Sequence, residues 1–380
     1  MKPGYMRAVL GGLGSLALCL LAVASASAQG AAPAKKPLLA EDVYKNIQVL
    51  RGVPENQFLA TMGSIAAGLA VNCSYCHDES SWDAYSKDTA NKQMARKMIV
   101  MMGSINQSYF ANKRMVTCWT CHRGNEHPSV TPVLEDVYGS PPPSEPDTLM
   151  AAADGGPTVN QILDKYLQAI GGAQKAAAIT SFTAKGTYQG FAELDKVPIE
   201  IYAKAPEQRT TVVHRLDGVW TTTTNGSEGW ASEPGRPVPL LELTWQFLDA
   251  ANIDGQLSFP AQIKQSFTDM RVGFPSTIDD KKVNMIQGMS GGKSLINLYF
   301  DDQTGLLVRQ VRFTNNPLGQ SPTQVDYADY RLVAGDKMPF RLTSTWLDGR
   351  AKMELTQIQP NVAIDAARFG NPGPPVLTKK

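Results

Sequence analysis

The sequence predicts an α+β protein of two domains, a small helical domain followed by an antiparallel β-sheet domain with a few helices. In residues 41–128 apolar side chains recur at helical spacing, whereas beyond residue 180 short runs alternate between apolar and polar residues. Residues 129–157 between them are rich in Pro, Gly, Ser and Asp, which predicts a semi-extended linker. A length of 380 residues is too great for one ordinary core and suits two domains.

The N-terminus has the pattern of an export signal. Lys2 and Arg7 precede an uncharged run over residues 8–24, and Ala26-Ser27-Ala28 is the small-x-small pattern that precedes signal-peptidase cleavage. We expect residues 1–28 to be a signal peptide and residues 29–40 a linker. The mature protein is then periplasmic, and an uncleaved leader that anchors the protein to the membrane is the alternative.

Three helices are expected in the first domain, residues 41–128. The first covers residues 41–50 and ends before Gly52-Val53-Pro54, the second starts at Pro54, and the third covers about residues 91–110. Met62-Gly-Ser-Ile65 and Met102-Gly-Ser-Ile105 form a weak internal repeat, each in front of a cysteine pair. Two similar helix-then-cysteine units are therefore expected.

The second domain, residues 158–374, begins with a helix over residues 159–170 that Gly171 and Gly172 end. A helical interruption is expected at residues 239–251, and Asp302-Gln303-Thr304-Gly305 predicts a turn between two strands. Strands are expected at residues 182–189, 199–203, 209–214, 219–224, 295–300, 306–313, 324–332 and 341–347. Strands joined by short turns predict an antiparallel sheet packed on a few helices.

Cys73-Ser-Tyr-Cys76-His77 and Cys118-Trp-Thr-Cys121-His122 both have the pattern C-x-x-C-H. This pattern attaches c-type haem, because two thiols one turn apart can add to the two vinyl groups of a porphyrin and the next residue, His, lies at the iron. The chain has five cysteines, and the fifth, Cys19, lies in the leader. The alternatives are one zinc site built from both pairs and thioredoxin-type redox pairs.

The sequence therefore predicts two covalently bound c-type haems. The residues expected to hold them are the thiols of Cys73, Cys76, Cys118 and Cys121 and the iron ligands His77 and His122. The sixth ligands stay open on spacing alone, because Met62 precedes Cys73 by 73 − 62 = 11 residues and four methionines precede Cys118. These four are Met94, Met98, Met101 and Met102.

A wider set of residues makes the resemblance specific. The runs that carry it are Phe58-Leu-Ala-Thr-Met62, Cys73-Ser-Tyr-Cys-His-Asp-Glu79, Ala95-Arg-Lys-Met98, Ile105-Asn106 and Val116-Thr-Cys-Trp-Thr-Cys-His-Arg-Gly124. They resemble the first two haem units of the cytochrome c subunit of photosynthetic reaction centres, over about residues 41–128. The resemblance implies that Met62 and Met98 are the sixth ligands. Met101 is expected mainly to pack, because a methionine stripe at helical spacing usually lies in the core.

The chain also departs from that family. The segment from Gln107 to Met115 is shorter and lacks the histidine that serves a distant haem in the family, and no third or fourth C-x-x-C-H follows. A two-haem relative is therefore implied. Its function would be electron transfer without enzymatic catalysis, with redox protein partners such as a membrane reaction centre or a respiratory complex.

Other functions remain as alternatives. A haem peroxidase or reductase needs one open iron position, so the loss of one methionine ligand would favour it. The second domain is similar to the half-barrel domains of periplasmic lipoprotein carriers, through Ile199-Glu-Ile-Tyr-Ala-Lys-Ala-Pro206 and Leu298-Tyr-Phe-Asp-Asp-Gln-Thr-Gly-Leu306. That likeness implies an apolar concavity. The domain would then either bind an apolar ligand there or act as a structural or docking module. A net charge of +1 argues against nucleic acid as a partner.

Overall fold

The computed structural model describes residues 37–139, 147, 155–190 and 193–375. The predicted signal peptide and residues 140–146 and 148–154 of the predicted linker lie outside the described residues. Within the described residues, none of the helices has both the length and the apolar character that a bilayer span needs.

The N-terminal part is helical, as predicted. Two helices dominate it, α2 (Glu55–Leu69) and α3 (Ala90–Tyr109), and the Thr89 side chain caps α3 by accepting a hydrogen bond from the Lys92 amide at 3.1 Å. The shorter elements are α1 (Ala40–Val43), η1 (Cys73–Tyr75), η2 (Ala84–Ser86), α4 (Cys118–His122) and α5 (Leu134–Tyr138).

Two predicted features of this part are wrong. The helix expected at residues 41–50 ends at Val43, because Asn46 adopts a positive φ of 62° and its side-chain amide donates to the Ser86 carbonyl and to Asp88. The segment expected to be semi-extended contains helix α5, which begins at Leu134.

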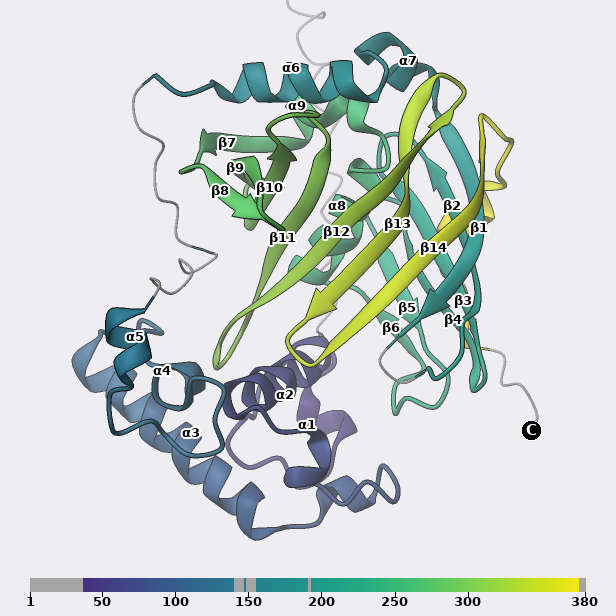
Figure 1. The fold of residues 1–380 in the computed structure, drawn as a ribbon. Helices are drawn as coiled ribbons and strands as arrows, with labels where there is room; N and C mark the ends of the chain where they lie inside the picture. The colour runs from purple at the N-terminus through teal and green to yellow at the C-terminus, as the bar shows by residue number, and fades with distance from the viewer. Residues whose placement is uncertain (1–36, 140–146, 148–154, 191–192, 376–380) are drawn as a thin grey trace, which may run out of the picture. The chain divides into compact units, whose positions relative to one another are not determined.

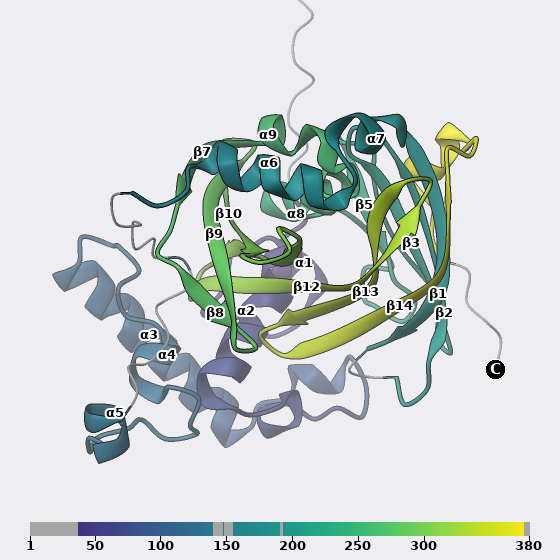
Figure 2. The same cartoon turned by 45° about the horizontal axis from the view of Figure 1, so that its top comes forward.

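The C-terminal part is an antiparallel sheet of 14 strands, confirming the predicted fold class. Its order is β6-β5-β4-β3-β2-β1-β14-β13-β12-β11-β10-β9-β7, with β8 paired to β9. Figures 1 and 2 show that the sheet is strongly curved. The strands are β1 (Ser181–Gln189), β2 (Val197–Lys204), β3 (Gln208–Arg215), β4 (Gly218–Thr224), β5 (Gly229–Ser232), β6 (Leu240–Glu242), β7 (Phe267–Val272), β8 (Ser276–Ile278), β9 (Lys281–Ser290), β10 (Ser294–Asp301), β11 (Leu307–Asn316), β12 (Gly319–Val333), β13 (Asp336–Trp346) and β14 (Gly349–Pro360).

The helices of this part cover the curved sheet. Helices α6 (Val159–Ile170) and α7 (Ala173–Ala178) lie across one end of it in Figures 1 and 2, and α8 (Gln246–Gln256) is followed by η3 (Pro260–Gln262) and α9 (Ile263–Ser266). The interruption expected at residues 239–251 is partly wrong, because its first residues form β6, which pairs with β5, and the helix starts at Gln246.

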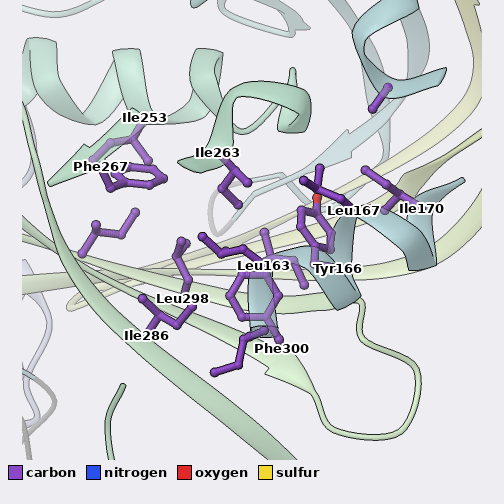
Figure 3. Close-up of a cluster of buried hydrophobic side chains, with 14 residues drawn as sticks. Leu163, Tyr166, Leu167, Ile170, Ile253, Ile263, Phe267, Ile286, Leu298 and Phe300 are labelled. Carbon is purple, nitrogen blue, oxygen red and sulfur yellow. The ribbon is translucent and has the colours of Figure 1, made fainter. Parts of the chain in front are cut away.

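Two apolar clusters form the core of this part, and the first of them packs the helices on the sheet. In Figure 3, Leu163, Tyr166 and Leu167 of α6 point toward side chains of the strands, and the Tyr166 and Phe300 ring centroids are 5.3 Å apart. A second cluster joins β1, β2, β13 and β14 around Phe182 and Phe340. A fully buried side chain of this size contributes roughly 1.5–3 kcal/mol, so these clusters stabilise the packing of this part.

The helical part also contacts the sheet directly. Leu318, in the turn between β11 and β12, is 3% exposed and belongs to an apolar cluster with Leu50, Val53 and Met102. Ser64 of α2 lies 3.0 Å from the hydroxyl oxygen of Ser321, and the Arg114 guanidinium donates to Asn315 at 3.0 Å. One hairpin of the sheet therefore packs into the apolar core of the helical part.

Candidate haem sites

The first C-x-x-C-H motif lies at the end of helix α2. Ala70 takes a left-handed conformation with φ 54° and ends the helix, and the chain then turns into η1, which begins at Cys73. Met62 of α2 lines the same cavity, of about 560 Å³, as Cys73, Cys76 and His77. The structure thus brings together all four residues predicted for the first haem, in a cavity whose size is within the roughly 300–1,000 Å³ that is usual for cofactor sites.

His77 is held in a defined orientation. Its Nδ1 lies 3.1 Å from the Tyr85 carbonyl oxygen, and its ring stacks on Tyr85 with centroids 5.0 Å apart. A carbonyl oxygen can only accept, so Nδ1 carries the proton and Nε2 keeps its lone pair. Burial lowers the pKa of His77, which favours the neutral ring that can bind a metal.

The two cysteines of this motif are free thiols. Cys73 is exposed and Cys76 is half-buried. The pKa of Cys73 is raised, first by burial and then by the carboxylate of Asp348, and burial also raises the pKa of Cys76. Before a haem is attached, both groups would therefore be protonated thiols at neutral pH.

The wall of the cavity is rich in basic side chains from the helical part. Arg96 pairs with Asp88 at 2.8 Å and is 13% exposed, and Lys92 Nζ donates to the Tyr85 carbonyl at 2.7 Å. These contacts tie the third helix to the loop that holds His77. Neither basic residue was predicted to line a haem site, although both line the cavity from the predicted helix.

The sheet supplies another part of the same wall. Arg236 and Pro237, between β5 and β6, and Trp346 and Asp348, at the turn between β13 and β14, line the cavity. These residues could not be predicted from the sequence, because they lie more than 150 positions from the motif and form no recognisable pattern.

The second C-x-x-C-H motif forms helix α4. His122 Nδ1 lies 3.1 Å from the Asn125 carbonyl oxygen, so this ring also keeps the Nε2 lone pair free. Cys118 is half-buried against the apolar cluster of the helical part, and Cys121 is exposed. The two motifs therefore orient their histidines by the same contact.

Gly68 lets α2 and α4 approach closely. A Cβ atom at this position would lie 2.8 Å from the Cβ of Cys118, which is closer than two such carbons can approach. The carbonyl of Gly68 also accepts a hydrogen bond from the Gly124 amide at 3.0 Å. A residue with no side chain is required here to position the second motif.

The four methionines of α3 differ in exposure. Met98 is half-buried, Met102 is 8% exposed and packs in the cluster with Leu318, and Met94 is 52% exposed. Met101 is 47% exposed, so the expectation that it mainly packs is wrong and Met102 has that role. The reason is that Met101 lies one residue, or about 100° around the helix, away from the buried face.

The remaining histidines lie elsewhere. His127 is exposed, and His214 on β3 lies 3.4 Å from the Glu200 carboxylate on the neighbouring strand. Within the described residues no three side chains of His, Cys, Asp or Glu form a group that could hold a metal ion, so the two cysteine pairs are not gathered into one zinc site.

The interior of the curved sheet is largely filled. A cavity of about 110 Å³ lies there, lined by apolar residues and by a polar group that sequence analysis missed. In this group Arg312 pairs with Asp254 at 2.8 Å, and Arg209 donates to the Ser258 hydroxyl at 2.6 Å. The volume is below the roughly 300 Å³ at which ligand pockets begin.

Comparison with known proteins agrees with the predicted resemblance. Residues 21–151 match the family model of the photosynthetic reaction centre cytochrome C subunit. The photosynthetic reaction center cytochrome c subunit of Roseobacter denitrificans is 37% identical over 114 residues, covering 27% of this chain and 31% of the relative. That of Thermochromatium tepidum is 34% identical over 93 residues, covering 23% of this chain and 22% of the relative.

The chain thus spans less than a third of the length of these curated relatives. Among solved structures, a LolA superfamily protein from Nitrosomonas europaea aligns with 57% of this chain and 98% of its own, at 13% identity and a TM-score of 0.40. A putative outer membrane lipoprotein-sorting protein domain from Vibrio parahaemolyticus aligns with 55% of this chain and 97% of its own, at 7% identity and a TM-score of 0.36.

Proposed function

We propose that this protein is an exported c-type cytochrome with two covalently attached haems and that it transfers electrons. Cys73 and Cys76 would attach the first haem, and Cys118 and Cys121 the second. The iron ligands would be His77 with Met62 and His122 with Met98.

The observation that carries this proposal is the shared geometry of the two histidines. Each follows a C-x-x-C pair, and each has Nδ1 3.1 Å from a backbone carbonyl oxygen. The contact between Nδ1 and the carbonyl oxygen fixes the tautomer and the orientation of a metal-binding imidazole and makes the imidazole a stronger ligand. A redox pair of the thioredoxin type would not need such an oriented histidine next to each cysteine pair.

The donor set of the first cavity fits a c-type haem. Two free thiols, a neutral imidazole and a thioether line one cavity, and its basic side chains suit the carboxylates of a porphyrin. The haem would supply the redox chemistry, and the chain would bind it, orient it and exclude water. Lys92, through Tyr85, and Arg96, through Asp88, hold α3 against the loop that carries His77 and so keep this cavity wall in place.

Electron transfer fits this ligand set better than catalysis. An iron that is bound by His on one side and by Met on the other has no position for peroxide or oxygen. Met62 is half-buried and lines the first cavity. Among the four methionines of α3, Met98 is the half-buried one. Binding of an apolar molecule inside the sheet receives little support from a cavity of about 110 Å³.

The partners are proposed from the matched segment. The relatives are named as subunits of photosynthetic reaction centers, so a redox protein in the periplasm, such as a membrane reaction centre or a respiratory complex, is the partner class that we propose. Because the match covers under a third of those relatives, photosynthesis itself is one of several electron-transport settings that this proposal allows.

The test is the mass and spectrum of the protein exported by a host that matures c-type cytochromes. We expect an intact mass with two haems, haem staining after denaturing electrophoresis, and the sulfur-to-iron charge-transfer absorption of the oxidised protein. Carbon monoxide should not bind the reduced protein stoichiometrically. A mass with one haem or none would refute the dihaem proposal, and stoichiometric carbon monoxide binding would favour a peroxidase or reductase.

A further inference from the structure

We infer that the β-sheet domain completes the first haem site, with Arg236 as a partner for a haem carboxylate and the turn at Trp346–Asp348 as a cover beside Cys73. This inference rests on the proposed haem at Cys73–His77. It assigns to the sheet a part in setting the reduction potential of one haem, a role that neither C-x-x-C-H motif reveals.

The cavity itself is the first argument. Its lining includes Met62 and His77 from the helical part and Arg236 and Trp346 from the sheet. Gly63, one residue after Met62, faces the turn at Asp348 so closely that a Cβ atom there would lie 3.1 Å from the Asp348 carboxylate. The turn therefore lies directly against the helix that carries the proposed methionine ligand.

The loop that carries Arg236 is fixed in place from both sides. Within the loop, the Glu233 amide donates to the Pro239 carbonyl at 2.8 Å, and Arg236 Nε pairs with the Glu233 carboxylate at 2.9 Å. From the helical part, the Trp82 indole donates to the Gly235 carbonyl at 2.6 Å. The bond from Trp82 to Gly235, the residue before Arg236, thus holds Arg236 at the cavity wall.

An aromatic series links this loop to the proposed iron ligand. Trp82 lies 5.3 Å from Tyr85, and Tyr85 lies 5.0 Å from His77, between ring centroids. Arg236 lines the same cavity as Tyr85 and His77, so its positive charge lies near the proposed haem position.

Arg236 has capacity for another anion. Its bond to Glu233 uses one of the five N–H donors of the guanidinium, and its side chain is 34% exposed. Arg96, the other arginine of the cavity, pairs with Asp88, also donates to the Asn46 carbonyl and is 13% exposed. Of these two arginines, Arg236 has more freedom to form a paired hydrogen bond with a carboxylate.

The consequence is a shift of one potential. Removing a positive charge beside the haem favours the ferric form, which carries one more positive charge than the ferrous form, and so lowers the potential. For Arg236→Gln we expect the reduction equilibrium of the first haem to fall by up to about tenfold, which corresponds to 59 mV for one electron. The second haem should keep its potential.

The experiment is a spectroelectrochemical titration of the full dihaem protein. The step of the first haem is identified as the one that is lost in a Cys73→Ser/Cys76→Ser variant. Arg236→Lys should recover most of the potential because it keeps the charge, and Trp346→Ala should expose the haem edge and also lower the first potential. Lys293→Gln is the control, since it removes the same charge from an exposed position of the sheet.

Each outcome decides the inference. A lower potential of the first haem in Arg236→Gln, with Lys293→Gln unchanged, supports it. An unchanged first potential, an equal shift of both haems, or an equal shift in Lys293→Gln overturns it, provided that intact mass shows two haems. If the mass shows no haem at Cys73, the proposed function itself fails, and the two failures are distinguished before any titration begins.

Discussion

Replacing Asp336 with Asn should make the protein more stable at neutral pH. Asp336 is the first residue of β13 and is 2% exposed. Its Oδ1 atom is buried and has no hydrogen-bond partner among the described residues. Burial raises its pKa from 3.8 to about 6, and a hydrogen bond from the Lys337 backbone only partly opposes this. Between pH 3.8 and about 6 the folded state therefore holds a proton on Asp336 that the unfolded state has already lost, and at neutral pH the folded protein has a buried charge.

The magnitude follows from this difference. A pKa that is raised by about two units corresponds to roughly 3 kcal/mol at most, since one unit is about 1.4 kcal/mol. The contribution of Asp336 to the free energy of unfolding is fully present below pH 3.8. It decreases as the pH rises through about 6 and is lost above that. Asn has no such charge, so the variant should gain up to this amount at pH 7 relative to the unmodified protein.

The assay is urea unfolding of both proteins by far-UV circular dichroism, at several values between pH 4 and pH 8. The quantity of interest is the difference in free energy of unfolding between Asp336→Asn and the unmodified chain, because other titrating groups cancel in it. We expect this difference to grow between about pH 4 and pH 6 and then to stay level. A difference that is independent of pH would refute the reasoning, because it would mean that Asp336 ionises normally in the folded protein.

Three further predictions concern the haem sites and their contact with the sheet. Met98→Ala should open the second iron to carbon monoxide and remove one sulfur-to-iron absorption. Met101→Ala should leave both sulfur-to-iron signals, because Met101 is exposed. The reverse result would mean that the ligand lies one turn of α3 away from Met98. Gly68→Ala should destabilise the protein by about 1–3 kcal/mol in urea unfolding and reduce attachment at Cys118, because its Cβ would meet Cys118, whereas Gly103→Ala, which meets nothing within 4 Å, should be neutral or slightly stabilising. Leu318→Ala should cost about 2–5 kcal/mol of unfolding free energy, while Leu332→Ala, 71% exposed, should cost less than about 0.5 kcal/mol; equal effects would mean that the hairpin does not pack into the helical core.

Local sequence signals predicted the elements that local contacts define. The helix over Val159–Ile170 has the predicted bounds because Thr158 and Gln161 form a capping box at its start and Gly171 ends it. The turn after β10 was predicted as well, and the Asp301 carboxylate accepts hydrogen bonds from the Gln303 and Thr304 amides there. In both places the determining contacts lie within a few residues.

Contacts that reach outside the segment itself account for the errors. The helix expected at residues 41–50 stops early because Asn46 bonds to Ser86 and Asp88, about forty positions away. Strand β9 was missed and β6 was read as helix, because each is defined by pairing with its neighbouring strands. Pairing energy of this kind is not visible in the period of a single segment.

The candidate sites divide in the same way. The C-x-x-C-H spacing encodes the thiols and the histidines, since one helical turn brings them together, and the structure adds the carbonyl that orients each ring. Spacing could not choose among the methionines of α3. Burial separates Met98 and Met102 from Met94 and Met101, which are exposed.

The placement of the β13–β14 turn changes how the two-part organisation should be understood. If the sheet were an accessory, its loops near the helical part would meet any surface of that part, yet Trp346, Asp348 and Arg236 all line the cavity of His77. The Leu318 hairpin inserts at a separate place, into the cluster that also contains Met102. Two separate regions of the sheet thus meet the helical part, one at the first proposed haem and one behind the second motif. Because a residue that shields a haem changes its solvation and thus its potential, a sheet in this position would affect the two haems differently.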